Sequence, residues 1–185
     1  MTYNLGHIAT IVKGKIIALH DNAEIRELLL DSRRISFPSS SLFFAIKGLR
    51  RDGHTFIGEA YNKGVRNFIV SEPPADLPDA NIILVNDVLA ALQILAAHHR
   101  TNCSIPVIGI TGSNGKTIVK EWLNQLLDDR YNIVRSPKSY NSQVGVPLSV
   151  WQLNETASLA IFEAGISQTG EMEKLQRIIR PTGGF

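Results

Sequence analysis

The sequence predicts an α/β fold in two domains, residues 1–103 and 104–185. Three observations carry this prediction. Short apolar runs typical of buried strands alternate with segments of helical periodicity along most of the chain. A glycine-bearing loop, residues 111–115, joins one such strand to the next helix, and a polar break at residues 101–104 separates the two sets of elements. The domain boundary is therefore placed between residues 103 and 104.

The first domain is predicted from alternating strands and helices. Its clearest strands are the apolar runs at residues 42–46, 67–70 and 81–85. One helix is expected over residues 54–63, because its apolar residues share a face and Gly64 follows in the position of a left-handed C-cap. A second helix is expected to begin after a cap at Asn86 or Asp87 and to end near residue 100.

The second domain is predicted as the first part of a P-loop domain with a doubly wound parallel sheet. Its strands are expected at residues 107–110, 132–134 and 159–162. Helices are expected over residues 116–129 and 170–180, the latter ended by Pro181. Helices that alternate with strands in this way favour parallel pairing. Three strands make an unfinished sheet, so we expect the chain to be part of a longer protein.

Composition and charge exclude several classes of function. The chain is 44% hydrophobic with a net charge of +2, which is typical of a soluble globular protein and too weakly basic to indicate a nucleic-acid partner. Cys103 is the single cysteine, so no internal disulfide can form. No apolar run is long enough for a signal peptide or a membrane span. We expect a cytoplasmic protein, monomeric and without membrane insertion.

The firmest chemical signal is the loop between the strand at 107–110 and the following helix. Its glycines allow backbone N–H groups to face a phosphate, and the helix N-terminus adds partial positive charge there. Lys116 is expected to reach the β- and γ-phosphates, and the Thr117 hydroxyl to ligate Mg²⁺. Ile110 stands where the strict P-loop pattern requires glycine, so a simple glycine-rich turn is the alternative. The predicted nucleotide-binding residues are Thr111, Gly112, Ser113, Asn114, Gly115, Lys116 and Thr117.

Several motifs in order along the chain resemble those of the Mur ligase family. Residues 109–117 are similar to the variant P-loop that Mur ligases share with folylpolyglutamate synthetases. Residues 31–33, 41–48 and 52–54 resemble the uridine-nucleotide-binding N-terminal domain, which folylpolyglutamate synthetases lack. Residues 140–148 and 163–171 are similar to the central domain of the branch that adds D-alanyl-D-alanine, and most of all to members fused to an alanine racemase. No racemase sequence lies within these residues.

The resemblance implies an ATP-dependent ligase of peptidoglycan synthesis that uses ATP and Mg²⁺. Its expected substrates are UDP-N-acetylmuramoyl-tripeptide and D-alanyl-D-alanine. ATP would phosphorylate the terminal carboxylate of the UDP-linked peptide, and the amine of the dipeptide would then attack the acyl phosphate. Catalysis of this kind depends on positioning and on neutralising charge around the γ-phosphate.

The resemblance also implies roles for single residues. Lys116 and Asn141 are the candidate catalytic residues, and Thr117 and Glu163 the candidate Mg²⁺ ligands. Glu163 could instead be a surface carboxylate at a strand end, and Asn141 could simply hold its own turn. The candidate substrate-binding residues are Ser32, Arg33, Lys47, Asp52 and His54. An arginine fork suits a diphosphate, but Asp52 could equally form a turn and His54 cap a helix.

Two other functions stay open. A sibling ligase that adds diaminopimelate or lysine would share the first domain and the phosphate loop. A non-catalytic module would hold a UDP-sugar or a nucleotide phosphate and catalyse no reaction. The resemblance places further adenine contacts, a modified lysine and an amino-substrate domain in sequence beyond this chain. We therefore expect the 185 residues to be inactive by themselves.

Overall fold

The computed structural model describes residues 2–184 except 49–50, 76 and 167. The chain divides into two compact units, residues 1–95 and 96–185. This division falls inside the helix α3 (Val88–Thr101). The domain boundary predicted at residues 103/104 lies just after that helix and stays a prediction.

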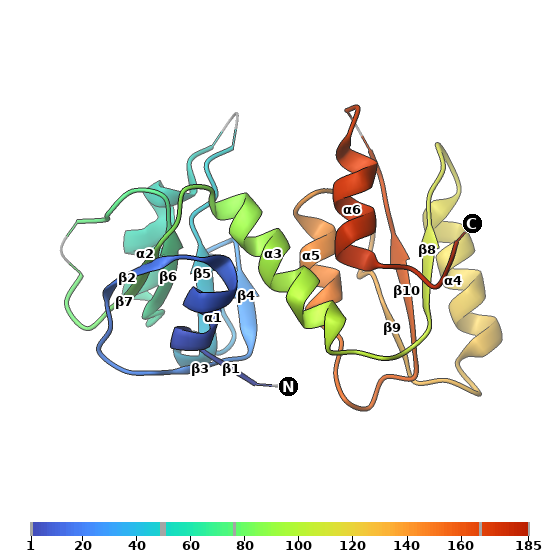
Figure 1. The fold of residues 1–185 in the computed structure, drawn as a ribbon, viewed down its shortest axis with the longest axis horizontal. Helices are drawn as coiled ribbons and strands as arrows, with labels where there is room; N and C mark the ends of the chain where they lie inside the picture. Colours follow the sequence, from blue (N-terminus) through green and yellow to red (C-terminus); the bar gives the residue numbers. More distant parts are fainter. Residues whose placement is uncertain (1, 49–50, 76, 167, 185) are drawn as a thin grey trace. The chain divides into compact units, whose positions relative to one another are not determined.

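The first unit is a five-stranded sheet with short flanking helices (Figure 1). Strands β4, β5, β6 and β7 are parallel, and β2 joins the edge of β7 in the antiparallel direction. A small antiparallel pair, β1 and β3, stands apart from this sheet. The elements are β1 (Tyr3–Asn4), α1 (Leu5–Val12), β2 (Lys15–Ala18), β3 (Glu24–Ile25), β4 (Glu27–Leu29), a 3₁₀ turn (Pro38–Ser40), β5 (Ser41–Phe44), a 3₁₀ turn (Gly53–Phe56), α2 (Ile57–Asn62), β6 (Asn67–Val70) and β7 (Asn81–Leu84).

Strands β5 and β6 form the core of this sheet because both of their faces carry buried apolar side chains; Ser41 and Asn67, at their first positions, are buried polar residues. Phe43 and Phe68 pack edge to face with 6.1 Å between ring centroids, and all four residues of each strand are buried. Continuous burial of this kind is typical of a parallel strand covered on both sides. The strand predicted at residues 67–70 is confirmed without a shift. The predictions did not include α1, β1, β2, β3 or β4.

The second unit is a four-stranded parallel sheet in the order β11–β8–β10–β9. The predicted doubly wound architecture is confirmed. Three strands were expected, and the described residues form these three and a fourth, because residues 183–184 pair with β8. Helix α5 was also not predicted. The elements are β8 (Val107–Ile110), α4 (Lys116–Leu127), β9 (Ile133–Arg135), α5 (Gly145–Val150), β10 (Leu159–Glu163), α6 (Glu171–Ile179) and β11 (Gly183–Gly184).

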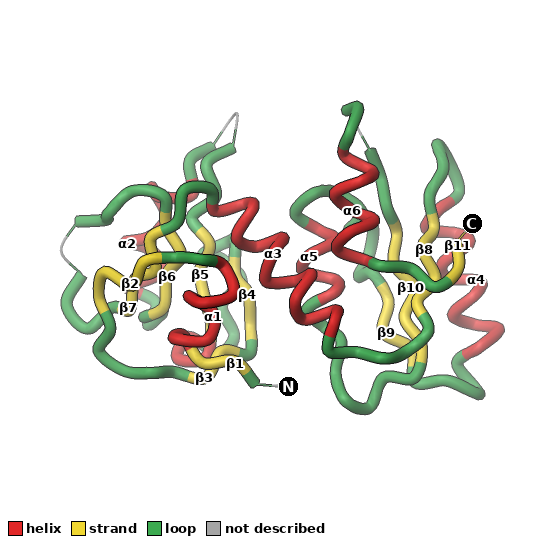
Figure 2. Tube along the Cα trace, in the orientation of Figure 1, coloured by secondary structure: helices red, strands yellow, loops and turns green. Residues whose placement is uncertain are grey.

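The helices of the second unit cover both faces of its sheet (Figures 1 and 2). Ala160 and Phe162 of β10 pack against α5 and α6 in one apolar cluster. Leu159 and Ile161 pack on the opposite face, with Leu123 and Leu127 of α4. Side chains alternate between the faces of a strand, so the next residue on the α4 side is Glu163. Among the described residues, no helix is both long and apolar enough to cross a membrane.

Candidate functional site: the phosphate loop and its buried carboxylate

The loop predicted to bind phosphate has the backbone that such binding requires. Gly112 and Gly115 have φ angles of 135° and 80°, in the region that favours glycine. Gly115 is the N-cap of α4, so the helix begins at Lys116. Residues 111–115 are exposed, and the first-turn N–H groups of a helix have no partner within the helix. The loop therefore presents N–H donors and the positive end of a twelve-residue helix to solvent.

The departure from the strict P-loop pattern has a structural reason. Ile110 is the last residue of β8, and its side chain is 2% exposed in the core under α4. The strand thus runs one residue further and the turn begins at Thr111. Lys116 lies at the start of α4, where its ammonium group donates a hydrogen bond of 2.6 Å to the Gly112 carbonyl oxygen. The lysine thus closes back over its own loop.

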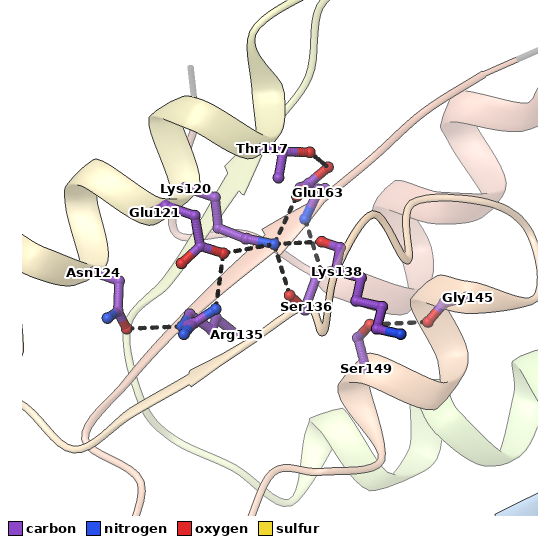
Figure 3. Close-up of polar contacts among 10 residues, drawn as sticks. All are labelled: Thr117, Lys120, Glu121, Asn124, Arg135, Ser136, Lys138, Gly145, Ser149 and Glu163. Atoms are coloured by element: carbon purple, nitrogen blue, oxygen red, sulfur yellow. Dashed lines mark hydrogen bonds and ion pairs between the residues drawn. The ribbon is translucent and has the colours of Figure 1, made fainter. Parts of the chain in front are cut away.

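Glu163 ends β10 directly beneath the start of α4. Its carboxylate oxygen Oε2 accepts a hydrogen bond of 3.1 Å from the Thr117 hydroxyl (Figure 3). The glutamate side chain is fully buried, so the alternative of a surface carboxylate is wrong. Sheet alternation and the first turn of α4 together bring the two candidate metal ligands into contact.

The second carboxylate oxygen of Glu163 is occupied differently. Oε1 is 2.9 Å from the Lys120 ammonium nitrogen, close enough for an ion pair. The approach is poorly directed, however, and this buried atom accepts no hydrogen bond from the described residues. A buried carboxylate oxygen without a directed donor retains lone pairs that a cation can use.

Lys120 is a residue of the candidate site that the sequence analysis missed. Its side chain is fully buried, and its ammonium group donates to the carbonyl oxygens of Ser136 at 2.8 Å and Lys138 at 2.5 Å. Glu121 lies 3.3 Å away. The available signal was helical spacing, because Lys120 shares a stripe of α4 with Leu123 and Leu127, which face the core.

Asn141 lies beside the end of β10. Its carbonyl oxygen accepts a hydrogen bond of 2.7 Å from the Gly165 N–H, and a Cβ atom at Gly165 would stand 3.0 Å from the Asn141 Cγ atom. A Cβ atom at Gly145 would similarly come within 2.9 Å of the Tyr140 Cα atom. The backbone N–H of Asn141 donates to the Ser139 carbonyl oxygen at 2.8 Å, but among the described residues no hydrogen bond holds the Asn141 side-chain amide to this turn. The amide therefore stays a candidate for contact with a ligand.

The oxygen atoms around Glu163 fit Mg²⁺. This ion prefers hard oxygen ligands and commonly binds through one or two carboxylates together with substrate phosphates. Thr117 and Glu163 would supply the protein's oxygen atoms, and the Oε1 atom, which is ion-paired with Lys120 but accepts no hydrogen bond from the described residues, supports this assignment. Residues 2–184, apart from those not described, contain no group of three or more histidine, cysteine, aspartate or glutamate residues that could hold a metal without further ligands.

Three of the predicted substrate-binding residues lie together beyond the carboxyl ends of strands β5 and β6. The His54 Nδ1 atom is 2.7 Å from Asp52 Oδ1, and the Lys47 ammonium nitrogen is 3.8 Å from Asp52 Oδ2. Asp52 also caps the 3₁₀ turn by accepting from the His54 N–H, so the capping residue is Asp52, and not His54 as the structural alternative expected. The hydrogen bond from the His54 backbone N–H has the largest effect on Asp52 and lowers its pKa, and the contact with the His54 ring lowers it further. The group also includes Ser71, whose N–H donates to His54 Nε2, and Glu72, which pairs with Lys47 at 3.1 Å.

Ser32 and Arg33 follow β4, the strand next to β5, but among the described residues no hydrogen bond or ion pair joins them to the Lys47, Asp52 and His54 group. The Arg33 guanidinium donates two hydrogen bonds to the Asp31 carboxylate, from Nε to Oδ1 at 2.9 Å and from Nη2 to Oδ2 at 2.7 Å. This hydrogen-bonded pairing holds the pKa of Asp31 well below its usual range. The side chain of Ser32 is buried, and its carbonyl oxygen accepts from Lys63 at 2.9 Å. A diphosphate at Arg33 would therefore have to compete with Asp31.

Known protein families match both units. Residues 24–100 match the Mur ligase family, catalytic domain, and residues 110–185 match the Mur ligase middle domain. The chain belongs to the Mur ligase family. Its two matched regions contain the phosphate loop, Glu163 and all five candidate substrate-binding residues.

Relatives of this Mur ligase chain are longer than the chain itself. It is 33% identical over 177 residues to the UDP-N-acetylmuramoyl-tripeptide–D-alanyl-D-alanine ligase of Bacillus subtilis, covering 95% of this chain and 38% of that protein. Its fold matches a crystal structure of MurF from Acinetobacter baumannii with a TM-score of 0.91 at 27% identity, over 100% of this chain and 40% of the other. MurF ligase from Thermotoga maritima in complex with ADP matches with a TM-score of 0.73 at 32% identity, over 84% and 36%.

Proposed function

We propose that this Mur ligase chain provides the UDP-substrate-binding and nucleotide-phosphate-binding parts of a ligase that joins D-alanyl-D-alanine to UDP-N-acetylmuramoyl-tripeptide in the cytoplasm. The observation that carries the proposal is the contact of Thr117 with the buried Glu163 at the mouth of the phosphate loop. Similarity to curated proteins that bear this ligase name supports the choice of substrates. The chain spans about 38% of the length of the first of these relatives.

In the proposed reaction, a terminal carboxylate oxygen of the UDP-linked tripeptide attacks the γ-phosphorus of ATP. The bond to the β,γ-bridging oxygen breaks, and ADP leaves. The amine of D-alanyl-D-alanine then attacks the acyl carbon, inorganic phosphate leaves, and the amine loses a proton. Mg²⁺, when bound with the nucleotide, would neutralise charge on the transferred phosphate.

The chain's own residues would bind and orient the nucleotide. The N–H groups of residues 112–117 would cradle the β-phosphate, and Lys116 would exchange its hydrogen bond with the Gly112 carbonyl for one to a phosphate oxygen. Asn141 would orient the acceptor carboxylate from the loop beside Gly165. Lys47, Asp52, His54, Ser32 and Arg33 would hold the UDP portion of the other substrate.

The experiment is a calorimetric titration of the chain with Mg²⁺-ADP and, separately, with UDP-N-acetylmuramoyl-tripeptide. Lys116→Ala should weaken ADP binding at least about tenfold, as expected for a lost charged hydrogen bond of about 1.5–3 kcal/mol, and leave the UDP substrate unaffected. Lys174→Ala is the control, because Lys174 is an exposed lysine of α6 outside the loop. A folded chain that binds neither ligand would contradict the proposal.

The alternatives separate in the same system. A UDP-linked acceptor that binds together with diaminopimelate or lysine, but not with D-alanyl-D-alanine, in the longest available form of the protein would identify a sibling ligase. We expect the 185 residues to bind both nucleotides and to release no phosphate from ATP. Phosphate release that depends on the tripeptide would show that these residues already carry the first chemical step.

A further inference from the structure

The buried ammonium group of Lys120 lies on the carboxylate that the proposed function assigns to the metal. Its nitrogen is 2.9 Å from Glu163 Oε1, and the side chains of both residues are fully buried. Two opposite charges at this distance form a pair with no net charge. Because the pair is buried, removing either charge is costly: the ion that remains is buried without a partner and is poorly solvated.

The lysine is held in place by backbone as well as by charge. The carbonyl oxygens of Ser136 and Lys138 accept two of its three donors (Figure 3). Ser136 is itself fixed to β10, because its N–H donates to the Ile161 carbonyl at 3.1 Å and its Oγ atom accepts from the Glu163 N–H at 3.1 Å. The ammonium group therefore cannot withdraw from Glu163 without breaking contacts to a second segment of the chain.

A free divalent ion meets a poor site under these conditions. It must share the Glu163 carboxylate with a fixed ammonium group, and Thr117 is the other oxygen ligand that the predicted site offers. A bound nucleotide improves the site in two ways. Its phosphates add oxygen ligands, and their negative charge offsets the positive charge of the ammonium group.

We propose, resting on the proposed function, that Lys120 is an internal counter-ion and positioning residue that makes divalent-metal binding at Glu163 depend on the phosphates of a bound nucleotide. Glu121 does not share this role. Its carboxylate is 38% exposed, lies further from Lys120 at 3.3 Å and pairs more closely with Arg135 at 2.8 Å.

The test is a titration of the chain with Mn²⁺, followed by electron paramagnetic resonance, with and without saturating ADP. In the unaltered chain we expect weak binding of Mn²⁺ alone and at least about tenfold tighter binding with ADP, within the usual range of coupling between two ligands. Lys120→Gln retains donors for the two carbonyl oxygens and removes the charge. It should bind free Mn²⁺ at least about tenfold more tightly, since a charge at contact distance commonly changes proton affinity of a carboxylate by about 1–3 pKa units.

The matched control is Glu121→Gln, which removes a neighbouring charge but leaves the contact between Lys120 and Glu163 in place. It should keep the free-Mn²⁺ affinity and the ADP dependence of the unaltered chain. A folded Lys120→Gln variant with unchanged free-Mn²⁺ affinity would overturn the inference.

Two further outcomes keep the test decisive. If Lys120→Gln fails to fold, the unaltered chain and Glu163→Gln decide: tight Mn²⁺ binding without nucleotide that disappears in Glu163→Gln overturns the inference, and weak binding that ADP strengthens through Glu163 supports it. If the unaltered chain binds no ADP even with Mn²⁺, the proposed function fails first. Intact binding of Mn²⁺ and ADP with no effect of Lys120→Gln removes this inference alone.

Discussion

Each unit gathers polar side chains at the carboxyl ends of parallel strands, but the two groups differ in burial. In the second unit Lys120 and Glu163 are completely buried. In the first unit the side chains of Lys47 and Glu72 are 60% and 66% exposed. The same sheet geometry positions both groups. Burial makes Lys120 and Glu163 a rigid pair whose partners depend on each other. Exposure leaves Lys47 and Glu72 weakly coupled and able to exchange their ion pair for contacts with a ligand.

The largest expected effect comes from breaking the buried pair. Lys120→Ala should lower the free energy of unfolding by about 3–5 kcal/mol, because Glu163 would be left as a buried charge without its counter-ion. Chemical denaturation followed by circular dichroism measures the change. A loss below about 1 kcal/mol would show that water reaches the pair and that the contrast between the two groups is wrong.

A smaller effect is expected at the phosphate loop. Gly115→Ala should destabilise the chain by about 1–2 kcal/mol. The φ angle of 80° would force the alanine into the left-handed conformation, where its Cβ atom lies too close to the following carbonyl oxygen. Gly58→Ala is the counterpart in the first unit, where Gly58 is an exposed residue of α2 with open space around its Cα atom. It should stabilise the chain by about 0.5–1 kcal/mol. Thermal unfolding of both variants checks the opposite signs.

The pairing of Asp31 with Arg33 predicts a modest acid dependence. The hydrogen bonds from Arg33 lower the pKa of Asp31 in the folded chain, so its stabilising contribution is present above the unfolded pKa of about 3.9 and is lost as pH falls through the folded pKa. The pair is partly exposed, so the contribution should stay below about 1 kcal/mol. Asp31→Asn should flatten the stability profile below about pH 4; an identical acid slope in both proteins would contradict this.

The smallest effect on stability is expected at Lys47. Its ion pairs with Glu72 and Asp52 are exposed, so Lys47→Ala should leave the free energy of unfolding close to that of the unaltered chain. The same variant should weaken binding of UDP-N-acetylmuramoyl-tripeptide while leaving ADP binding intact. Equal loss of both ligands, or a large loss of stability, would show that Lys47 supports the fold instead of the ligand.

Much of this fold could be predicted because local sequence patterns are enough to predict its clearest strands and helices. The apolar run at residues 67–70 and the strand–loop–helix unit at 107–117 needed no distant partner to be recognised. Strand β11 could not be found in this way, because Gly183 and Gly184 have no apolar pattern and become a strand only by pairing with β8. Helix α5 escaped for a similar reason, since it is short and contains both Gly145 and Pro147.

The sequence by itself determined the α/β class, the phosphate loop, the family resemblance and the candidate residues Lys116, Thr117 and Glu163. These depend on local patterns, such as a glycine loop before a helix or a carboxylate at the end of an apolar run. Only the tertiary structure decided that Glu163 is buried, that Thr117 and Lys120 lie on its two oxygens, and that Arg33 is engaged by Asp31. The contacts of Glu163 join residues up to 46 positions apart, and the packing of β10 under α4 creates them. The contact of Arg33 with Asp31 spans only two positions, but its geometry depends on the conformation of the loop after β4.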